Sequence, residues 1–323
     1  MKQIEIRVLS EQDVIRVAPK LGAIVDLVED TYRLEAQVPT KIGVHPEQWK
    51  GGFCHAMPAW VAPARALGMK WVSYLPGNLE RGFADSTALI VLNDPDTAQP
   101  VALMEGMWIT YARTAACAAV MARHLANPKP VRLGLVGCGG LGKWSLLVLA
   151  EIFPTLKEIH VSSRTPESRR SFCAAMEKQG RWSLRAVDNV EDAVRGMDIV
   201  VTSTPKNVQP PVHEAAWGAG SVAIPLDVTA ALDDACYAKA DLFVSDGFDA
   251  FRVAMARQRP RMTLPKEPVE LADVLLGRKE GRTSSRQRIL AVPTGVGSVD
   301  MTLGWEIYRR AREANLGTIV SLT

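Results

Sequence analysis

The fold of this chain is decided by one stretch, LGLVGCGGLG at residues 133–142. Its first four residues are apolar and predict a buried strand, and residues 144–152 beyond it have helical spacing. Between the two stand Gly137, Gly139 and Gly142, which permit a tight turn, close approach of backbone to a pyrophosphate, and close packing of helix on strand. Because the helix N-terminus also faces the phosphate charge, the stretch predicts a dinucleotide-binding turn. The cofactor contacts predicted here are Gly137, Gly139, Gly140, Leu141 and Gly142.

Strand and helix signals alternate after the glycine turn. This alternation predicts an α/β fold, a doubly wound parallel sheet with helices on both faces. We place this Rossmann domain at residues 126–299, because the prolines of segment 127–130 end the preceding helix. Its further strands are expected at residues 158–162, 198–202, 221–225 and 242–244.

The part of the chain before residue 126 has a different pattern. Residues 68–74 and 88–94 look extended and are followed by turn chemistry and a further apolar run at 101–104, which predicts an antiparallel meander. Residues 21–36 have helical spacing, and the alanine-rich segment 110–123 is strongly helical. At the other end of the chain, residues 301–315 also have helical spacing.

Composition excludes several classes of protein. The chain has 323 residues, 38 basic and 35 acidic, and no long basic run, so nucleic acid is not an expected partner. No segment approaches the roughly 20 apolar residues that span a bilayer, and the N-terminus lacks the apolar core of a signal peptide. We therefore expect a soluble, cytoplasmic protein without a membrane partner. The five cysteines, with no C-x-x-C pair, and the five scattered histidines predict reduced thiols and no metal site.

The end of the second Rossmann strand distinguishes the two nicotinamide dinucleotides. NAD usually meets a carboxylate there, whereas NADP meets an arginine with small hydroxyl residues. This chain has Ser163, Arg164 and Thr165 at that place and no acidic residue, so a 2′-phosphate is the expected neighbour. A solvated loop arginine is the alternative. NADP(H) is therefore favoured, and NAD(H) stays open.

Several segments together resemble the ornithine cyclodeaminase and mu-crystallin family. They follow the family's order and cover nearly the whole chain. Besides the glycine turn they are HAMPA at 55–59, GMKWV at 68–72, LNDPDT at 92–97, ITYARTAA at 109–116 and PTGVG at 293–297.

The resemblance implies a domain layout and a ligand. Residues 1–125 and 300–323 would form an α/β substrate-binding and dimerisation domain, with the Rossmann domain inserted and the protein a homodimer. An amino acid or its imine would lie beside the nicotinamide. The substrate contacts implied by position are Lys41, Lys70, Thr87 and Arg113. The further cofactor contacts implied are Thr114, Thr202, Ser203, Thr204, Gly295 and Val296.

Lys70 and Arg113 suit the chemistry of a 2-imino acid. Such a substrate is polarised by a nearby cation and takes a proton on nitrogen as hydride arrives at carbon. Arg113 offers a planar fork for a carboxylate, and its small apolar neighbours argue against an exposed helix face. Lys70 offers a point charge whose pKa burial can lower. The alternatives are a solvated side chain for Lys41 and a plain β-branched strand residue for Thr87.

Asp227 is the second candidate for moving the proton. It follows a predicted strand and should emerge at the carboxyl edge of the sheet, where doubly wound folds bind ligands. In cyclodeaminase-like members of the family, a carboxylate here acts on the substrate amine. This chain departs from that pattern, because VTAAL occupies residues 228–232, where a glycine, a lysine and a glutamate are usual. A turn or helix-capping aspartate is the alternative.

A second departure is Ala98 after Thr97, where the family usually has glycine. Because alanine disfavours positive φ, the sequence predicts an altered local turn.

Three functions fit these observations. The favoured one is an NAD(P)H-dependent oxidoreductase that reduces a 2-imino acid (ketimine) to an amino acid, or catalyses the reverse dehydrogenation. The second is a cyclodeaminase that recycles bound NAD and releases ammonia. The third is a mu-crystallin-like protein that binds NADPH as a ligand without turnover.

Overall fold

The computed structural model describes residues 3–34, 36–39, 41–205, 211–260, 262 and 268–323. The chain divides into two compact units. The first unit comprises Met1–Arg113 and Val296–Thr323, and the second comprises Thr114–Gly295. The first division falls inside helix α3 (Met107–Leu125), whereas the sequence placed it at the end of that helix.

The first unit is built on a mixed sheet, which has seven strands in the described part of the chain. Neighbours β3 to β6 pair antiparallel, which confirms the predicted meander, and β1 pairs parallel with β6. In spatial order the strands are β15 (Thr318–Ser321), β1 (Glu5–Leu9), β6 (Pro100–Glu105), β5 (Ser86–Asn93), β4 (Ala66–Tyr74), β3 (Phe53–Val61) and β2 (Ile42–Val44).

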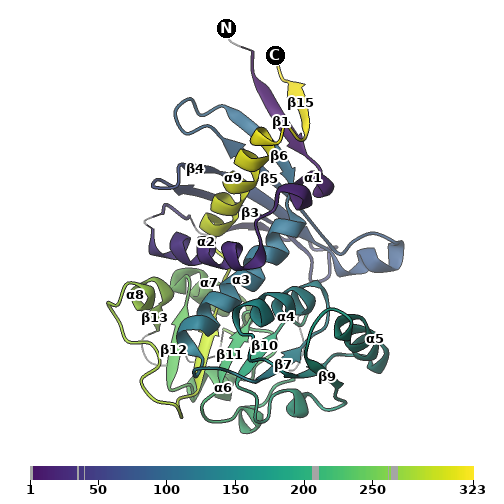
Figure 1. Ribbon diagram of the computed structural model, residues 1–323, viewed down its shortest axis with the longest axis vertical. Coiled ribbons are helices and arrows are strands. Elements are labelled where there is room, and N and C mark those ends of the chain that lie inside the picture. The colour runs from purple at the N-terminus through teal and green to yellow at the C-terminus, as the bar shows by residue number, and fades with distance from the viewer. Residues whose placement is uncertain (1–2, 35, 40, 206–210, 261, 263–267) are drawn as a thin grey trace. The chain divides into compact units, whose positions relative to one another are not determined.

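Helices cover one face of this sheet. Helix α9 (Gly297–Glu313) packs on β3, β4 and β5, with α2 (Leu21–Arg33) and α1 (Glu11–Val17) beside it (Figure 1). The alternation of β4 points every second side chain at α9, so Lys70 lies in the core with Ile90 and Met104. The sequence placed the start of α9 at residue 301, four residues too late. One further helical turn, η1 (Pro76–Arg81), connects β4 with β5.

The turn between β5 and β6 holds Ala98 in an uncommon backbone conformation. The carboxylate of Asp94 accepts from the backbone N–H of Asp96 at 3.1 Å and from that of Thr97 at 2.8 Å. Ala98 adopts φ +59°, the left-handed conformation that glycine takes without strain. Alanine takes this conformation here because the hydrogen bonds to Asp94 outweigh its preference for negative φ.

The second unit is a parallel sheet, as predicted, with eight strands in the described residues. From β7 the chain adds β8 and β9 on one side of the sheet. From β10 on, it adds strands on the other side. The chain order therefore reverses between β7 and β10, and doubly wound folds bind ligands at the carboxyl ends of the strands at such a point. In spatial order the strands are β13 (Val269–Glu270), β12 (Leu242–Ser245), β14 (Ile289–Val292), β11 (Val222–Pro225), β10 (Ile199–Thr202), β7 (Arg132–Val136), β8 (Glu158–Ser162) and β9 (Ser183–Ala186).

Helices and helical turns connect these strands (Figure 1). The six inner strands of this described sheet are almost wholly buried because helices cover both faces. The connecting elements are α4 (Gly140–Ile152), α5 (Pro166–Glu177), η2 (Val190–Ala193), η3 (Glu214–Ala216), α6 (Asp234–Ala238), α7 (Phe248–Gln258) and α8 (Leu271–Leu275).

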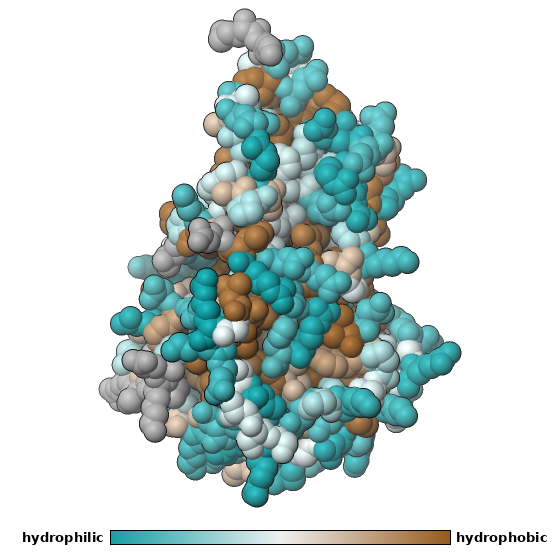
Figure 2. All heavy atoms as spheres, turned by 60° about the vertical axis from the view of Figure 1, so that its left-hand side comes forward, coloured by the Kyte–Doolittle hydropathy of each residue, from teal (hydrophilic) through white to brown (hydrophobic). Residues whose placement is uncertain are grey.

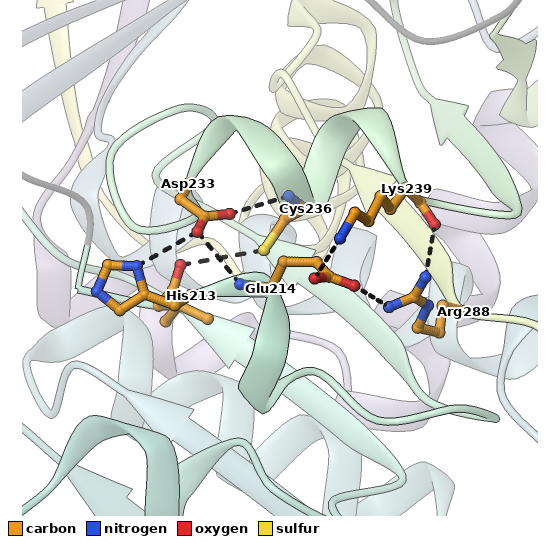
Figure 3. A network of polar contacts seen from close by, with 7 residues as sticks. His213, Glu214, Asp233, Cys236, Lys239 and Arg288 are labelled. Atoms are coloured by element: carbon orange, nitrogen blue, oxygen red, sulfur yellow. Dashed lines mark hydrogen bonds and ion pairs between the residues drawn. The ribbon is translucent and has the colours of Figure 1, made fainter.

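A polar network ties the amino-terminal side of β14 to helix α6 (Figure 3). The carboxylate of Glu214 accepts from Nζ of Lys239 at 2.9 Å and pairs with the guanidinium of Arg288. Asp233 caps α6, accepting from the backbone N–H of Cys236 at 2.9 Å. These contacts fix the loops at the edge of the sheet opposite to the carboxyl ends of its strands.

The surface of the molecule carries both hydrophilic and hydrophobic side chains. Figure 2 shows that hydrophilic side chains cover much of one face, with smaller hydrophobic areas between them. Among the described residues, no helix is long and apolar enough to cross a bilayer.

Candidate active site

Three charged side chains meet inside the first unit. Lys70 of β4 is fully buried, and its Nζ donates to Oδ1 of Asp300 at 2.7 Å. Arg113 of α3 is buried as well, and its Nε donates to the same Oδ1 at 2.9 Å. We call Lys70, Arg113 and Asp300 the charged cluster. The structure thus brings together two of the residues that the sequence singled out, Lys70 and Arg113.

The cluster changes the proton affinity of Lys70. Burial lowers the pKa of its ammonium, and repulsion from Arg113 and, to a smaller extent, from Lys41 lowers it further. The attraction of Asp300 opposes these effects, and the resulting pKa of Lys70 is about 7. An amine that titrates near neutral pH can both deliver and accept a proton under ordinary conditions.

Asp300 was not predicted from the sequence. It lies in the first turn of α9, between the buried residues Val299 and Met301. Because the predicted helix starts at Met301, Asp300 falls in a predicted loop. Aspartate is common in loops, so the sequence gives no signal there. Within a helix, an acid between buried apolar residues signals a partner of opposite charge, since an isolated buried carboxylate is too costly.

Thr87 is not brought to the charged cluster. In the pairing of β4 with β5, Lys70 stands opposite Ile90, and Thr87 stands opposite Ser73. Because side chains alternate between faces, Thr87 points away from the face that holds Lys70. Its Oγ1 lies 2.8 Å from Oγ of Ser73 instead. Lys41 immediately precedes β2 and acts on Lys70 by charge repulsion.

The glycine turn of the second unit leaves no room for a side chain at two of its glycines. Gly137 has φ +111°, and a Cβ there would lie 2.5 Å from the carbonyl oxygen of Ser203. A Cβ on Gly142 would lie 2.4 Å from the carbonyl oxygen of Gly137. At Gly139, which caps α4, a Cβ would meet nothing within 4 Å. The turn is therefore closed on the protein side and open over the helix N-terminus, which fits a pyrophosphate.

The segment after β8 presents hydroxyl groups and an exposed arginine. Oγ of Ser163 donates to the carbonyl oxygen of Thr165 at 3.0 Å, and Thr165 caps α5. Arg164 is exposed, whereas Arg169 is buried and donates to the carbonyl oxygen of Ser163 at 3.1 Å. The sequence missed Arg169, whose bond supports the backbone of this segment.

Asp227 joins the ends of β10 and β11. Its Oδ1 accepts from Oγ1 of Thr202 at 3.0 Å. Its Oδ2 accepts from the backbone N–H of Thr204 at 2.8 Å and from the hydroxyl of Thr204 at 3.1 Å. Burial raises the pKa of Asp227, and these hydrogen bonds oppose the rise. Ser203, between the two threonines, has its Oγ 3.5 Å from the carbonyl oxygen of Gly137.

The residue after Asp227 has an unusual backbone. Val228 adopts φ +60°, which is a genuine outlier for a β-branched side chain. Its carbonyl oxygen accepts from Oη of the buried Tyr237 at 2.6 Å, and its N–H donates to the carbonyl oxygen of Pro225 at 3.1 Å. These bonds hold a tight turn at the carboxyl end of β11.

The remaining predicted cofactor residues lie where the two units join along the chain. Thr114 follows Arg113 within α3 and begins the second unit, which Gly295 ends. Gly295 has φ +75°, and Val296 caps α9. Among the described residues, no three His, Cys, Asp or Glu side chains are grouped as a metal would need.

Comparison with known proteins identifies the family. The model of the "Ornithine cyclodeaminase/mu-crystallin family" matches residues 6–315. The chain belongs to this family. That finding confirms the resemblance drawn from the sequence motifs.

Three relatives span almost the full chain. The nodulation efficiency protein NfeD of Rhizobium meliloti is 29% identical, with 98% of each chain covered. The structure of Thermococcus litoralis Δ1-pyrroline-2-carboxylate reductase with NADH and L-proline has a TM-score of 0.88 at 25% identity, covering 97% of this chain and 99% of that one. The structure of an archaeal alanine dehydrogenase dimer with bound NAD has a TM-score of 0.88 at 26% identity, covering 99% and 100%.

Proposed function

We propose that this protein is an NAD(P)H-dependent oxidoreductase that reduces a 2-imino acid to the amino acid, or catalyses the reverse dehydrogenation. The charged cluster carries this proposal. Stability does not explain a buried lysine whose pKa is lowered to about 7. Strongly perturbed groups of this kind gather at functional sites. The reductase and the dehydrogenase among the relatives act on the same class of carbon–nitrogen bond.

The second unit would hold the cofactor. The glycine turn would carry the pyrophosphate, and Thr202, Ser203 and Thr204 lie at the end of β10, next to the switch point of the sheet. Ser163, Arg164 and Thr165 support NADP, because an exposed guanidinium with neighbouring hydroxyl groups suits a 2′-phosphate. When bound, the cofactor supplies the hydride that reduces the imine carbon.

Lys70 would supply the proton. Reduction of an imine requires one proton on nitrogen for the hydride that arrives at carbon, and a lysine with a pKa of about 7 carries that proton at neutral pH and below. Arg113 and Lys41 would attract the substrate carboxylate, since both place positive charge beside Lys70. A cation near the imine also favours the transition state, in which electrons move toward nitrogen.

Asp227 fits this proton transfer less well than Lys70. Both of its oxygens already accept hydrogen bonds from Thr202 and Thr204. To take up a substrate proton it would have to release donors that hold two loops at the ligand edge of the sheet. We therefore assign Asp227 to support of the cofactor loop, and this counts against a cyclodeaminase reaction.

A homodimer also belongs to this proposal. The archaeal alanine dehydrogenase is a dimer. In this chain the sheet face opposite to Lys70 exposes large apolar side chains, among them Trp71 at 39% and Leu89 at 48%. Exposed apolar patches on a sheet are typical of protein interfaces.

The test is a turnover assay on purified protein. Δ1-pyrroline-2-carboxylate, or pyruvate with an amine, is mixed with NADPH and separately with NADH, and loss of cofactor absorbance is followed. We expect turnover of at least one imine, with NADPH preferred. No loss of absorbance with any imine would contradict the proposal, and release of ammonia from ornithine without net change of cofactor would favour the cyclodeaminase instead.

A further inference from the structure

Asp300 lies at the centre of the charged cluster. Its Oδ1 accepts from Nζ of Lys70 on β4 at 2.7 Å and from Nε of Arg113 on α3 at 2.9 Å. Three elements that are far apart in the sequence thus meet at one carboxylate oxygen. Because a buried cation without a compensating charge is strongly disfavoured, the carboxylate fixes where both cations stand.

We propose that Asp300 is a positioning residue of the reductase site, which holds Lys70 beside Arg113 and keeps on Lys70 the proton that imine reduction consumes. The inference rests on the proposed function for the identity of the substrate. The titration of Lys70 that tests it requires no turnover, so the inference and the proposed function can fail separately.

The surroundings of Lys70 leave this task to Asp300. The charged groups that act on Lys70 are Arg113 on α3, Asp300 on α9 and Lys41 before β2. Its cross-strand neighbours, Met57 and Ile90, are uncharged. Burial and both other cations favour the neutral amine, so Asp300 is the group among these that favours the ammonium.

The second carboxylate oxygen strengthens this effect. Oδ2 of Asp300 is buried and accepts no hydrogen bond from the described residues. The large majority of buried polar side-chain atoms have at least one hydrogen-bond partner. Among the described residues the donors to Asp300 are the two cations, so the stabilisation falls on Lys70 and Arg113.

The direct test is the titration of Lys70 in the protein without substrate. Lysine labelled with 13C at Cε reports protonation through its chemical shift, and the K70M variant identifies the signal of Lys70. We expect Lys70 to titrate near pH 7, and in D300N to titrate about one to three pH units lower. An unchanged titration in folded D300N would overturn the proposal.

Turnover gives a second readout. The rate of imine reduction in the wild-type protein should fall as pH rises through about 7. In D300N this descending limb of the pH–rate profile should move to lower pH. The E306Q variant is the matched control, because Glu306 lies on the same helix but pairs with Arg309 and Arg310. It removes the same charge and should leave the limb in place. A uniform loss of rate at all pH values in D300N would indicate a structural role only and would contradict the proposal.

A double variant covers the case in which D300N alone does not fold. Replacing Asp300 leaves a buried ammonium without its carboxylate, whereas in K70M there is no ammonium to strand. In the K70M background D300N strands only the Arg113 guanidinium, so the loss in urea midpoint should be smaller there. D300N/K70M should therefore fold even if D300N, which strands both cations, does not. Equal losses in both backgrounds, or failure of both variants to fold, would overturn the proposal.

Discussion

Thr204 donates both its backbone N–H and its hydroxyl to a single oxygen of Asp227, at 2.8 and 3.1 Å. The carboxylate therefore sets the path of the loop after β10. An asparagine at position 227 has one carbonyl oxygen in place of two, so at least one of the three donors from Thr202 and Thr204 would lose its acceptor. Leaving a buried donor unsatisfied costs about 1–3 kcal/mol.

We predict that D227N weakens cofactor binding by about tenfold or more, since each 1.4 kcal/mol or so corresponds to tenfold. The pH dependence of turnover, which we assign to Lys70, should stay where it is. Titration of tryptophan fluorescence with NADPH measures the first quantity, and rate against pH measures the second. If D227N lost the limb near pH 7, Asp227 would be the proton carrier.

Ala98 offers a test of backbone strain. The left-handed conformation costs a residue with a Cβ about 1–2 kcal/mol, and replacing Ala98 by glycine removes this cost. Part of the gain in stability is offset because glycine makes the unfolded chain more flexible. We predict that A98G raises the free energy of unfolding by about 0.5–1 kcal/mol, measured by urea denaturation. N315G is the control, because Asn315 also has positive φ, at +49°, but asparagine tolerates it. A gain in N315G as large as in A98G would refute this explanation.

Arg164 decides the choice between cofactors in our proposal. Its guanidinium is exposed beside Ser163 and Thr165. A charge-assisted bond to a phosphate is worth roughly 1.5–3 kcal/mol, so R164A should weaken NADPH binding by about ten- to a hundredfold and leave NADH binding nearly unchanged. R170A, which removes an exposed arginine of α5, is the matched control. An equal loss of affinity for NADPH and NADH in R164A would contradict the role of Arg164 in the preference for NADPH.

The network around Glu214 predicts a dependence of stability on pH. Hydrogen bonds from Lys239 and Arg288 lower the pKa of the Glu214 carboxyl below its usual value of 4.5. A group whose pKa is lower in the folded state stabilises the fold above its unfolded pKa, and this contribution is lost as pH falls through the folded value. E214Q should therefore lower the free energy of unfolding by about 1–2 kcal/mol at pH 7 and by progressively less below pH 4.5. Urea denaturation at several pH values measures the difference, and a constant difference down to acid pH would speak against this origin.

Much of the fold follows from the sequence because its signals are local. The glycine turn stands between a strand and a helix, and the apolar runs that follow it gave most of the parallel sheet. Strand β14 was missed, although it lies between β11 and β12, since a four-residue apolar run after a long polar segment has no distinctive pattern.

The site was harder to predict because it depends on pairing between distant segments. Lys70 and Arg113 could be named from their motifs, but their partner Asp300 stands 187 residues after Arg113 in the chain. The place of Thr87 depends on pairing as well. Only the register of β4 with β5 decides which face it takes, and a residue-type pattern does not specify that register.

The charged cluster also predicts that carboxylate ligands bind together with a proton. A ligand carboxylate adds negative charge near Lys70, whose pKa of about 7 must then rise. Binding at pH 8 should take up a fraction of a proton per site, and the affinity should fall as pH rises through about 7. Isothermal titration calorimetry with pyrrole-2-carboxylate, repeated in buffers of different ionisation enthalpy, counts the protons directly. In K70M the uptake should vanish, and an uptake that persists in that variant would place the titrating group elsewhere.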